Sequence, residues 1–354
     1  MNPIHSVPSS RRADAGFTLI ELLVSLAVTA VLILGVLATF DFSARMNKVQ
    51  LNVADMQQSL RIAQNEVVRL SRMTGRGSLP TNIAVEVANN RPAGSKLVAT
   101  DGLTEIEPLT DVLRLRGVFS SSLYQIDWQN PSVWGTPGAD GKGSVLIKPL
   151  AAGVPQDLEA LLKVAMPDDK PGESLLLVTP FDIHAVAQIV SAAKEGENLK
   201  ITFERHPNET ALAGPLTAGM PAAAYIGILE EYAFYVRHGN GSDAPALAKA
   251  RLEPGSSLPY NYKNDPASGN ARLDLADNIY DLQVALGFGV AGAPELRVTT
   301  LVRTDRSDAG QYLAPLLPAL IGDHAYPTNH LLNSTAERRH RWRLMQTSVN
   351  LRNL

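Results

Sequence analysis

The sequence predicts an α+β fold in which one long N-terminal helix packs on a β-rich globular domain. Three observations predict it. Residues 17–40 form an apolar run, and an amphipathic helical pattern continues from there to about residue 73. Gly75, Gly77 and Pro80 then end the helix. Beyond this point the apolar residues alternate in short segments, which is typical of β-strands.

The apolar run follows a short basic segment that contains Arg11 and Arg12. Its 24 residues would form about 36 Å of helix, enough to cross a hydrocarbon core of about 30 Å. A secretory signal has a shorter apolar core with its cleavage site afterwards, whereas the small-residue junction here, Gly16-Phe17, comes before the run. We therefore expect a single-pass membrane helix. The arginines place residues 1–16 in the cytoplasm and the rest of the chain outside it.

Glu21 is the single charged residue of the apolar run. A charged side chain at the centre of a membrane helix costs about 2.5–3.5 kcal/mol on insertion scales, so this carboxylate needs a partner. A plain signal anchor that tethers an exported domain is the alternative interpretation, but it gives Glu21 no role.

The segment around Glu21 resembles the prepilin cleavage and methylation motif of type IV pilins and type II secretion pseudopilins. It reads Gly16-Phe17-Thr18-Leu19-Ile20-Glu21-Leu22-Leu23-Val24. The resemblance implies that a membrane aspartyl prepilin peptidase cuts between Gly16 and Phe17 and methylates the new amine of Phe17. It also implies that Glu21 acts in filament assembly.

The physical chemistry of Glu21 agrees with this implied role. Cleavage would leave a positive amine on Phe17, and in stacked subunits that amine can meet the Glu21 carboxylate of a neighbour. The pair attracts far more strongly in a low-dielectric filament core than in water. Either charge left unpaired there would cost several kcal/mol, so the pair would control the register of assembly.

Four later segments resemble the minor pilins called PilW, in order and in spacing. They are Tyr232-Ala233-Phe234-Tyr235-Val236-Arg237, Ile279-Tyr280-Asp281-Leu282-Gln283-Val284, Leu296-Arg297-Val298-Thr299-Thr300-Leu301-Val302-Arg303 and Thr347-Ser348-Val349-Asn350-Leu351-Arg352-Asn353. Proteins of that family often carry cysteines in the exported domain, and this chain has none. Disulfide-based details of the family therefore do not transfer.

The resemblance implies a division of the chain into four parts. They are a prepilin leader (1–16), a transmembrane and assembly helix (17–40), its amphipathic continuation (41–74) and an exported β-rich domain (75–354). The implied location is the inner membrane, with a cytoplasmic N-terminus and a periplasmic domain, and afterwards the filament at the cell surface. The implied partners are the prepilin peptidase, other minor pilins, the major pilin and the inner membrane.

Within the amphipathic part, apolar residues step by four and three along one helix face. They are Val49, Val53, Met56, Leu60, Ala63, Val67 and Leu70. This stripe predicts packing on the chain's own domain, with a separate coiled coil as the alternative.

The domain itself is expected to be built mainly of strands. The expected strands are 96–100, 111–119, 144–148, 174–180, 185–191, 199–204, 224–237, 278–288, 295–304 and 342–352. The other expected segments are a short helix (156–165), turn-rich loops (129–143 and 253–271) and a long mixed segment (305–340). We interpret the domain as a single unit, with a split into two β subdomains near residue 170 as the alternative.

The residue content excludes several kinds of chemistry. The absence of cysteine excludes thiolate metal sites and cysteine nucleophiles. The segment Gly287–Gly292 matches the dinucleotide fingerprint, but Pro294 and a strand follow it where a helix is needed, so we expect a hairpin. The seven histidines lack zinc-site spacing, although His324 and His330 could meet Asp323 in a loop. We expect no enzyme, no cofactor and no metal.

The charge balance gives no general indication of nucleic-acid binding, because the formal net charge is −3. One basic cluster precedes the last strand, and it consists of Arg338, Arg339, His340, Arg341 and Arg343. We interpret it as a solvated entry to that strand, with contact to DNA phosphates as the alternative.

The function that we expect is assembly. The chain would be a minor pilin that joins other minor pilins to start a type IV pilus, at or near the tip. A domain of this size is easier to place at the end of a filament than in its shaft, which favours few copies. The alternatives are a minor pseudopilin of type II secretion, a tip-borne module that binds a surface, a sugar or DNA, and an anchored enzyme.

Overall fold

The fold is known from a computed structural model. The structure describes residues 18–97, 105–121, 123–147, 173–196, 198–239, 243–256, 258, 272–289, 292–308, 313–351 and 353. The leader, the Gly16-Phe17 junction and the helix expected at 156–165 lie outside the described residues, as does most of the strand expected at 96–100. The chain divides into two compact units, Met1–Leu51 and Asn52–Leu354.

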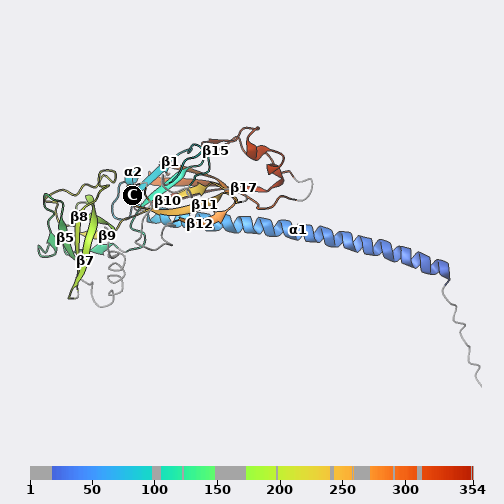
Figure 1. Cartoon of the computed structure of the whole chain (residues 1–354), viewed down its shortest axis with the longest axis horizontal. Coiled ribbons are helices and arrows are strands. Elements are labelled where there is room, and N and C mark those ends of the chain that lie inside the picture. Colours follow the sequence, from blue (N-terminus) through green and yellow to red (C-terminus); the bar gives the residue numbers. More distant parts are fainter. Residues whose placement is uncertain are drawn as a thin grey trace, which may run out of the picture. The chain divides into compact units, whose positions relative to one another are not determined.

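Helix α1 runs without a break from Leu19 to Met73, as the sequence predicted (Figure 1). Its end is built from local hydrogen bonds. The hydroxyl of Thr74 donates to the carbonyl of Leu70 at 2.9 Å, and Gly75 adopts a positive φ of 76°, which a glycine tolerates without strain. The next glycine, Gly77, is required by space, because a Cβ there would lie 2.3 Å from a methyl group of Leu176.

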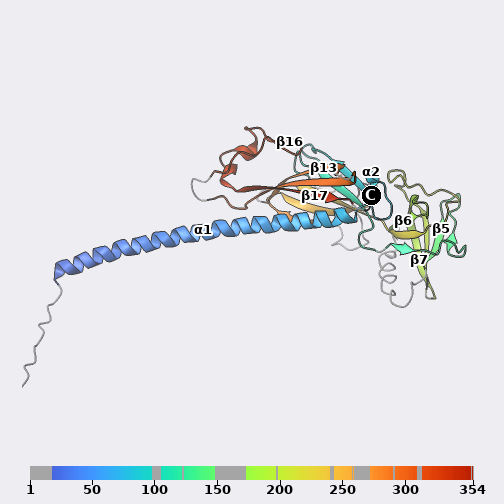
Figure 2. The same ribbon diagram turned by 180° about the vertical axis from the view of Figure 1, so that it is seen from behind.

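The second half of α1 packs on its own domain, which confirms the predicted apolar stripe. The buried members of the stripe are Met56, Leu60, Ala63, Val67 and Leu70. They share a hydrophobic cluster with Val298 and Val302 on strand β14 and with Leu351 after strand β17. Figures 1 and 2 both show β17 beside this half of the helix. The stripe therefore buries the helix within its own chain.

Two sheets adjoin the helix and the short helix α2 (Thr81–Ala84). The first has the order β1 (Val85–Ala88), β2 (Val112–Gly117), β10 (Glu230–Arg237), β11 (Ala246–Leu252) and β12 (Arg272–Asp277). The second has the order β13 (Ile279–Phe288), β14 (Pro294–Arg303) and β17 (Trp342–Asn350). All the pairings in these two sheets are antiparallel.

A third sheet is inserted between β2 and β10. Its order is β3 (Tyr124–Gln125), β9 (Tyr225–Ile228), β6 (Ser174–Val178), β7 (His184–Glu195), β8 (Asn198–Arg205), β5 (Gly143–Ile147) and β4 (Trp134–Gly135). It has its own apolar cluster, which includes Leu177, Ile201 and Phe203. A boundary near residue 170 is wrong, because β5 and β6 flank that position and belong to the same sheet.

The segment 224–237, expected as one strand, is two. The chain leaves the inserted sheet at the end of β9 and enters the five-stranded sheet with β10. Leu229 makes the transition, since its N–H donates to the carbonyl of Ser174 at 2.8 Å while its side chain is buried in the cluster under α1. The apolar pattern continues through the transition because both strands are buried, so the pattern alone could not show the break.

A buried ion-pair network lies near this transition. The fully buried carboxylate of Glu231 on β10 binds the guanidinium of Arg116 on β2, with 2.6 Å from Nε to Oε2. Arg116 also binds Glu86 on β1 at 2.5 Å and donates to the carbonyl of Ile83 at 2.9 Å. Because each charge has a partner, the desolvation cost of burying it is offset.

The adjacent acid, Glu230, holds the start of the insertion. Its carboxylate accepts hydrogen bonds from the backbone N–H groups of Phe119 (3.1 Å) and Ser120 (2.6 Å). Arg251 on β11 bridges Glu230, at 3.5 Å, and Glu173, at 3.0 Å, which directly precedes β6. These contacts tie the five-stranded sheet to the inserted one.

The mixed segment expected at 305–340 folds back over the three-stranded sheet. It contains β15 (Leu320–Ile321), β16 (His324–Ala325) and the 3-10 helices η1 (Leu331–Asn333) and η2 (Glu337–Arg339). Its buried residues Leu317, Ile321 and Tyr326 pack on Leu301 of β14. Asp281 of β13 anchors it, because the carboxylate accepts hydrogen bonds from Tyr326 at 2.6 Å and His324 at 3.0 Å.

The described residues on both sides of 290–291 pair as the two arms of a hairpin, as expected for the fingerprint-like segment. The N–H of Gly289 donates to the carbonyl of Ala293 at 2.8 Å, and Phe288 pairs with Pro294 where β13 meets β14. No helix follows it, so the geometry needed for a bound pyrophosphate is absent from this described part of the chain.

The ion-pair network predicts a large cost for removing Arg116. We expect Arg116→Ala to lower the free energy of unfolding by about 3 kcal/mol, because the buried carboxylate of Glu231 loses its closest charged partner and keeps Arg114, at 3.5 Å, and the N–H of Gly255, at 2.8 Å. Lys200→Ala, which removes an exposed ion pair with Glu195, is the matched control and should cost less than about 1 kcal/mol. Denaturant unfolding of the full chain in detergent micelles measures both. Equal effects of the two substitutions would contradict the assigned role of the network.

Asp111 predicts a pH-dependent stability. Burial raises the pKa of this carboxyl to about 6 from 3.8, with a further rise from the charges of Asp323 and Asp281. A raised pKa means that the folded state favours the neutral form. Stability from this group is therefore complete below about pH 4 and declines as the pH rises through 6, by at most about 3 kcal/mol. Asp111→Asn should remove this component, which unfolding curves of both proteins between pH 4 and 7.5 would reveal as a pH-dependent difference.

Candidate functional site at the start of helix α1

Thr18 and Glu21 close the first turn of α1 with reciprocal hydrogen bonds. The backbone N–H and the hydroxyl of Thr18 each donate to Oε2 of Glu21 at 3.0 Å, and the N–H of Glu21 donates to the hydroxyl of Thr18 at 3.3 Å. This is a capping box, which satisfies donors that a helix start would otherwise leave unpaired. Our sequence interpretation missed this local role, although the Thr-x-x-Glu spacing shows it.

The capping box uses one oxygen of the Glu21 carboxylate. Oε1 makes no hydrogen bond or ion pair with any residue that the structure describes, and the side chain is exposed. A carboxylate has about four acceptor positions, so the Thr18 contacts leave room for a further donor. The site can thus stabilise its own helix and bind a cation. Gly16 and Phe17, the other two residues of the predicted site, lie outside the described residues.

The first half of α1 is an apolar surface that its own unit does not cover. Its large side chains from Leu19 to Phe40 are all more than half exposed. Among the described residues, α1 is the one helix that is long and apolar enough to span a membrane. Its hydroxyls bond within the helix, since Ser25, Thr29 and Thr39 donate to the carbonyls of Leu22, Ser25 and Gly35. Such internal bonds suit an environment without water.

The polar residues of this apolar segment share one face. At about 100° per residue, Glu21, Ser25, Thr29 and Thr39 fall within one third of the helix circumference, and Gly35 lies beside them. A shallow hollow follows Glu21, Ser25 and Thr29 along the surface. Membrane helices approach one another closely at faces of small and polar residues.

The histidines that the structure describes occupy separate places, apart from one pair. His206 hydrogen-bonds Ser174 at 2.9 Å, and its burial lowers its pKa to about 4. His324 and His330 do come together, with ring centroids 6.0 Å apart, but His324 contacts Asp281 where we expected Asp323. No set of three His, Cys, Asp or Glu side chains with metal-binding geometry is found among the described residues.

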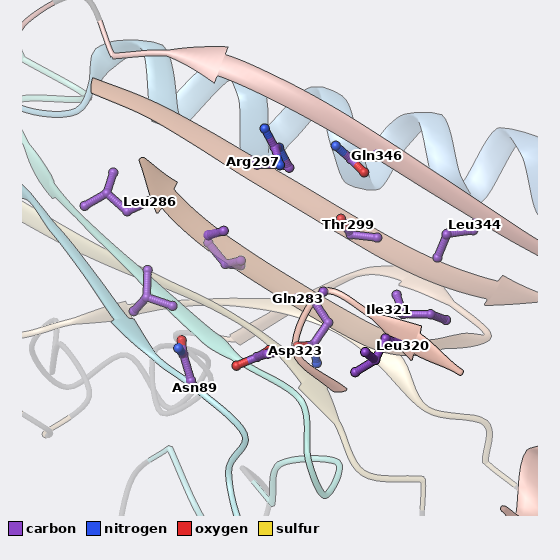
Figure 3. Close-up of a pocket in the computed structure, with 14 residues that line it drawn as sticks. Asn89, Gln283, Leu286, Arg297, Thr299, Leu320, Ile321, Asp323, Leu344 and Gln346 are labelled. Carbon is purple, nitrogen blue, oxygen red and sulfur yellow. The ribbon is translucent and has the colours of Figure 1, made fainter. Parts of the chain in front are cut away.

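A groove of about 830 Å³ lies on the outer face of the three-stranded sheet (Figure 3). Its sides come from β13, β14 and β17, with the hairpin of Leu320 and Asp323 at one end. Its described lining contains no histidine, lysine, serine or cysteine; its hydroxyl is that of Thr299 and its carboxylate that of Asp323. Beside it, the Asp111 carboxylate accepts from the N–H groups of Val284 and Asn90 and so blocks part of the β13 edge.

Some side chains of the basic cluster before β17 make contacts within the domain. The Nε group of Arg338 donates to the carbonyl of Ala314 at 2.7 Å, and Arg341 pairs with Asp308 at 2.8 Å. Two of its four arginines are therefore held by internal contacts, which favours the structural interpretation of the cluster over a contact with DNA phosphates.

Comparison with known proteins identifies one family model. Residues 11–37 match the prokaryotic N-terminal methylation motif. Comparison with curated proteins and with solved structures gave no match. The matched residues include the capping box and most of the exposed apolar face. Together, motif and helix support a type IV pilin-like or pseudopilin protein that is anchored in a membrane.

The capping box predicts that Thr18 stabilises the first turn of α1. We expect Thr18→Ala to lower the stability of this turn by about 1 kcal/mol, because the cap loses its hydroxyl. Faster amide hydrogen exchange at residues 19–22 of the full chain in micelles would show the loss. Thr39→Ala is the control, since its hydroxyl bonds a carbonyl in the helix interior. Unchanged exchange in Thr18→Ala would contradict the capping role.

Proposed function

We propose that this chain is a minor pilin of the PilW kind, which helps to start a type IV pilus and stays at or near its tip. The observation that carries the proposal is the first turn of α1. An acid stands at the start of an uncovered apolar helix, with one carboxylate oxygen free of contacts to the described residues. The match to the methylation motif supports a new amine at Phe17, four residues before this acid.

In the proposed assembly, subunits associate through their apolar helices. Glu21 of one subunit receives the Phe17 amine of the next, while Thr18 continues to hold the other carboxylate oxygen. The face with Ser25, Thr29 and Gly35 lies against a neighbouring helix, because small side chains allow the closest approach. The Phe17–Glu21 pair would set the register, since a helix shifted along its neighbour leaves both charges unpaired.

The β-rich domain supports a place at the filament end. The inserted seven-stranded sheet adds bulk between β2 and β10, and only one of its faces joins the cluster under α1, through Leu176, Val178 and Val186. A shaft of closely packed helices has little room for such an addition, whereas an end position does not restrict it. The proposed orientation has the leader in the cytoplasm and the domain in the periplasm until assembly. Proposed partners are the prepilin peptidase, other minor pilins and the major pilin.

A minor pseudopilin of a type II secretion system is the second candidate. The same observation favours it equally, because the matched motif serves both filaments. Deletion of the gene separates the two candidates when surface pili, twitching and secretion are scored together. Loss of pili and twitching with normal secretion supports the pilus assignment. Loss of secretion with intact pili would replace it with the pseudopilin assignment.

Two substitutions test the proposed role of the Glu21 charge. Glu21→Gln keeps an acceptor for Thr18 and so preserves the capping box, but it removes the charge. We expect this variant to remain in the membrane while its incorporation into sheared filaments falls at least about tenfold, because the partner amine stays unpaired. Glu21→Ala should behave in the same way. Immunoblots of membrane and filament fractions measure both quantities.

Thr18→Ala is the matched control for this experiment. It weakens the cap and leaves the charge, so its incorporation should stay close to that of the unmodified protein. Normal incorporation of Glu21→Gln would refute the charge-pair mechanism. Equal loss in Thr18→Ala and Glu21→Gln would contradict a specific role for the charge.

A further inference from the structure

Strand β17 is an edge of the three-stranded sheet, and its ladder with β14 shows which of its backbone groups point outwards. The N–H of Leu351 donates to the carbonyl of Pro294, and the N–H of Thr304 donates to the carbonyl of Arg341, both at 2.9 Å. Because bonding alternates along an antiparallel pair, the odd-numbered residues of β17 bond to β14. The N–H and C=O groups that point away from β14 belong to Leu344, Gln346, Ser348 and Asn350.

These outward groups have no partner in the part of the chain that the structure describes. No hydrogen bond to the backbone of these four residues is found there, and all four residues are exposed. Unpaired backbone donors and acceptors are rare when buried, so water or another chain must bind them. They recur about every 6.8 Å along the strand, which is the two-residue repeat of an antiparallel sheet.

The other sheet edges in the described chain carry features that hinder pairing. β12 has three charged residues among six, and its pairing with β11 contains a register shift. Asp111 binds two outward groups of β13, the carbonyl of Leu282 and the N–H of Val284. β1 has four residues, and β3, β4, β15 and β16 have two each. Sheet proteins protect exposed edges in these ways.

β17 has none of these protective features. It has nine residues without proline or glycine, and its ladder with β14 shows no register shift. Its one charged residue is Arg343, so the edge from Leu344 to Asn350 is uncharged. The side chains of Leu344 and Gln346 line the groove on the outer face, which leaves the strand open on that side (Figure 3). A long, regular and exposed edge of this kind is a template for pairing with another chain.

The charges at the start of β17 indicate what kind of segment fits. Arg343 is exposed, and its side chain has no hydrogen bond or ion pair with the described residues. Asp308 and Glu337, the acids that contact this region, are already paired with other arginines. Residues 338–352 contain no Asp or Glu, so a second copy of this strand would bring no acid to Arg343. A segment of another protein with acidic residues at this end is complementary in charge.

We propose that β17 binds an extended segment of another protein, which adds a fourth strand to the three-stranded sheet and carries acidic residues at its C-terminal end. The backbone of the segment would bond the outward N–H and C=O groups, as in other cases of strand addition. Antiparallel addition places the C-terminal end of the segment beside Arg343, because β17 begins there. This inference depends on the folded domain alone and is independent of the filament assignment.

A synthetic peptide tests the pairing. The probe is the acetylated and amidated peptide TVSVTVDE, which joins strand-forming residues to two acids at its C-terminal end. We expect saturable binding to the full chain in detergent micelles, measured by fluorescence anisotropy of the labelled peptide. The control is the same peptide with every backbone nitrogen methylated, which keeps the side chains but has no N–H to donate. The methylated peptide should not bind.

A charge reversal tests the complementarity. Arg343→Glu should weaken binding of the acidic peptide at least about fivefold, because attraction becomes repulsion. The same variant should bind TVSVTVKK, in which lysines replace the two acids. Arg343 is exposed and without described side-chain partners, so the variant should fold. Lys142→Glu, an exposed change in the turn before β5, is the control and should bind the acidic peptide normally.

Amide hydrogen exchange locates the bound peptide. Binding should slow exchange at Gln346 and Ser348, whose N–H groups point outwards, and leave Met345 and Thr347, which bond to β14, unchanged. Absence of binding, equal binding of the methylated peptide, full binding by Arg343→Glu or unchanged exchange at Gln346 would each overturn the proposal. Protection of Gln346 that rises with protein concentration in the absence of peptide would also overturn it, because the edge would then belong to a contact between copies of this chain.

Discussion

The apolar surface of the first half of α1 is the constraint on which the rest of the molecule depends. From Leu19 to Phe40 nothing within its own unit covers the large side chains, so either lipid or neighbouring helices must do so. The hydrogen bonds within this segment suit a surface that lipid or other helices cover. Hydroxyl groups bond carbonyls of their own helix, and Glu21 is held by Thr18. The polar groups of this segment are therefore largely satisfied before any partner arrives, and one carboxylate oxygen is left for recognition.

Beyond residue 51 the apolar side chains of the same helix are covered, because strands of its own chain bury the apolar stripe. That packing uses the three-stranded sheet and one face of the five-stranded sheet, and Leu176, Val178 and Val186 of the inserted sheet join the same cluster. The other face of the inserted sheet has a separate core, and contacts of Glu230 and Arg251 also join this sheet to the five-stranded one. Charged contacts of this kind demand specific geometry, whereas apolar contacts tolerate sliding. The insertion is thus held both by charged contacts and by the apolar cluster under the helix.

Sequence patterns predicted the parts of the molecule that local chemistry determines. The length of α1, its end before Gly75 and the hairpin at Gly287–Gly292 follow from periodicity and glycine placement. Strand β11 was missed, because Ala246–Leu252 is rich in alanine and basic residues that favour helices, and its neighbours impose the strand. The inserted sheet was missed as well, since sheet membership depends on long-range pairing. Of the candidate site, the sequence indicated Glu21 but not its local partner Thr18.

The end of the chain returns to the end of the helix. The side-chain amide of Asn353 donates to the carbonyls of Arg72 and Thr74, at 2.8 and 3.4 Å, just after β17 has run beside α1. A helix held in a membrane or filament transmits mechanical load to whatever it is fastened to. Here the fastening includes the last strand and the residues after it, and the N–H of Gly75 also donates to the carbonyl of Arg116 on β2 at 3.1 Å, so tension on α1 would reach both sheets. Substitutions at Leu176 or Val178 of the inserted sheet would weaken the same attachment, since both side chains share the cluster under the helix.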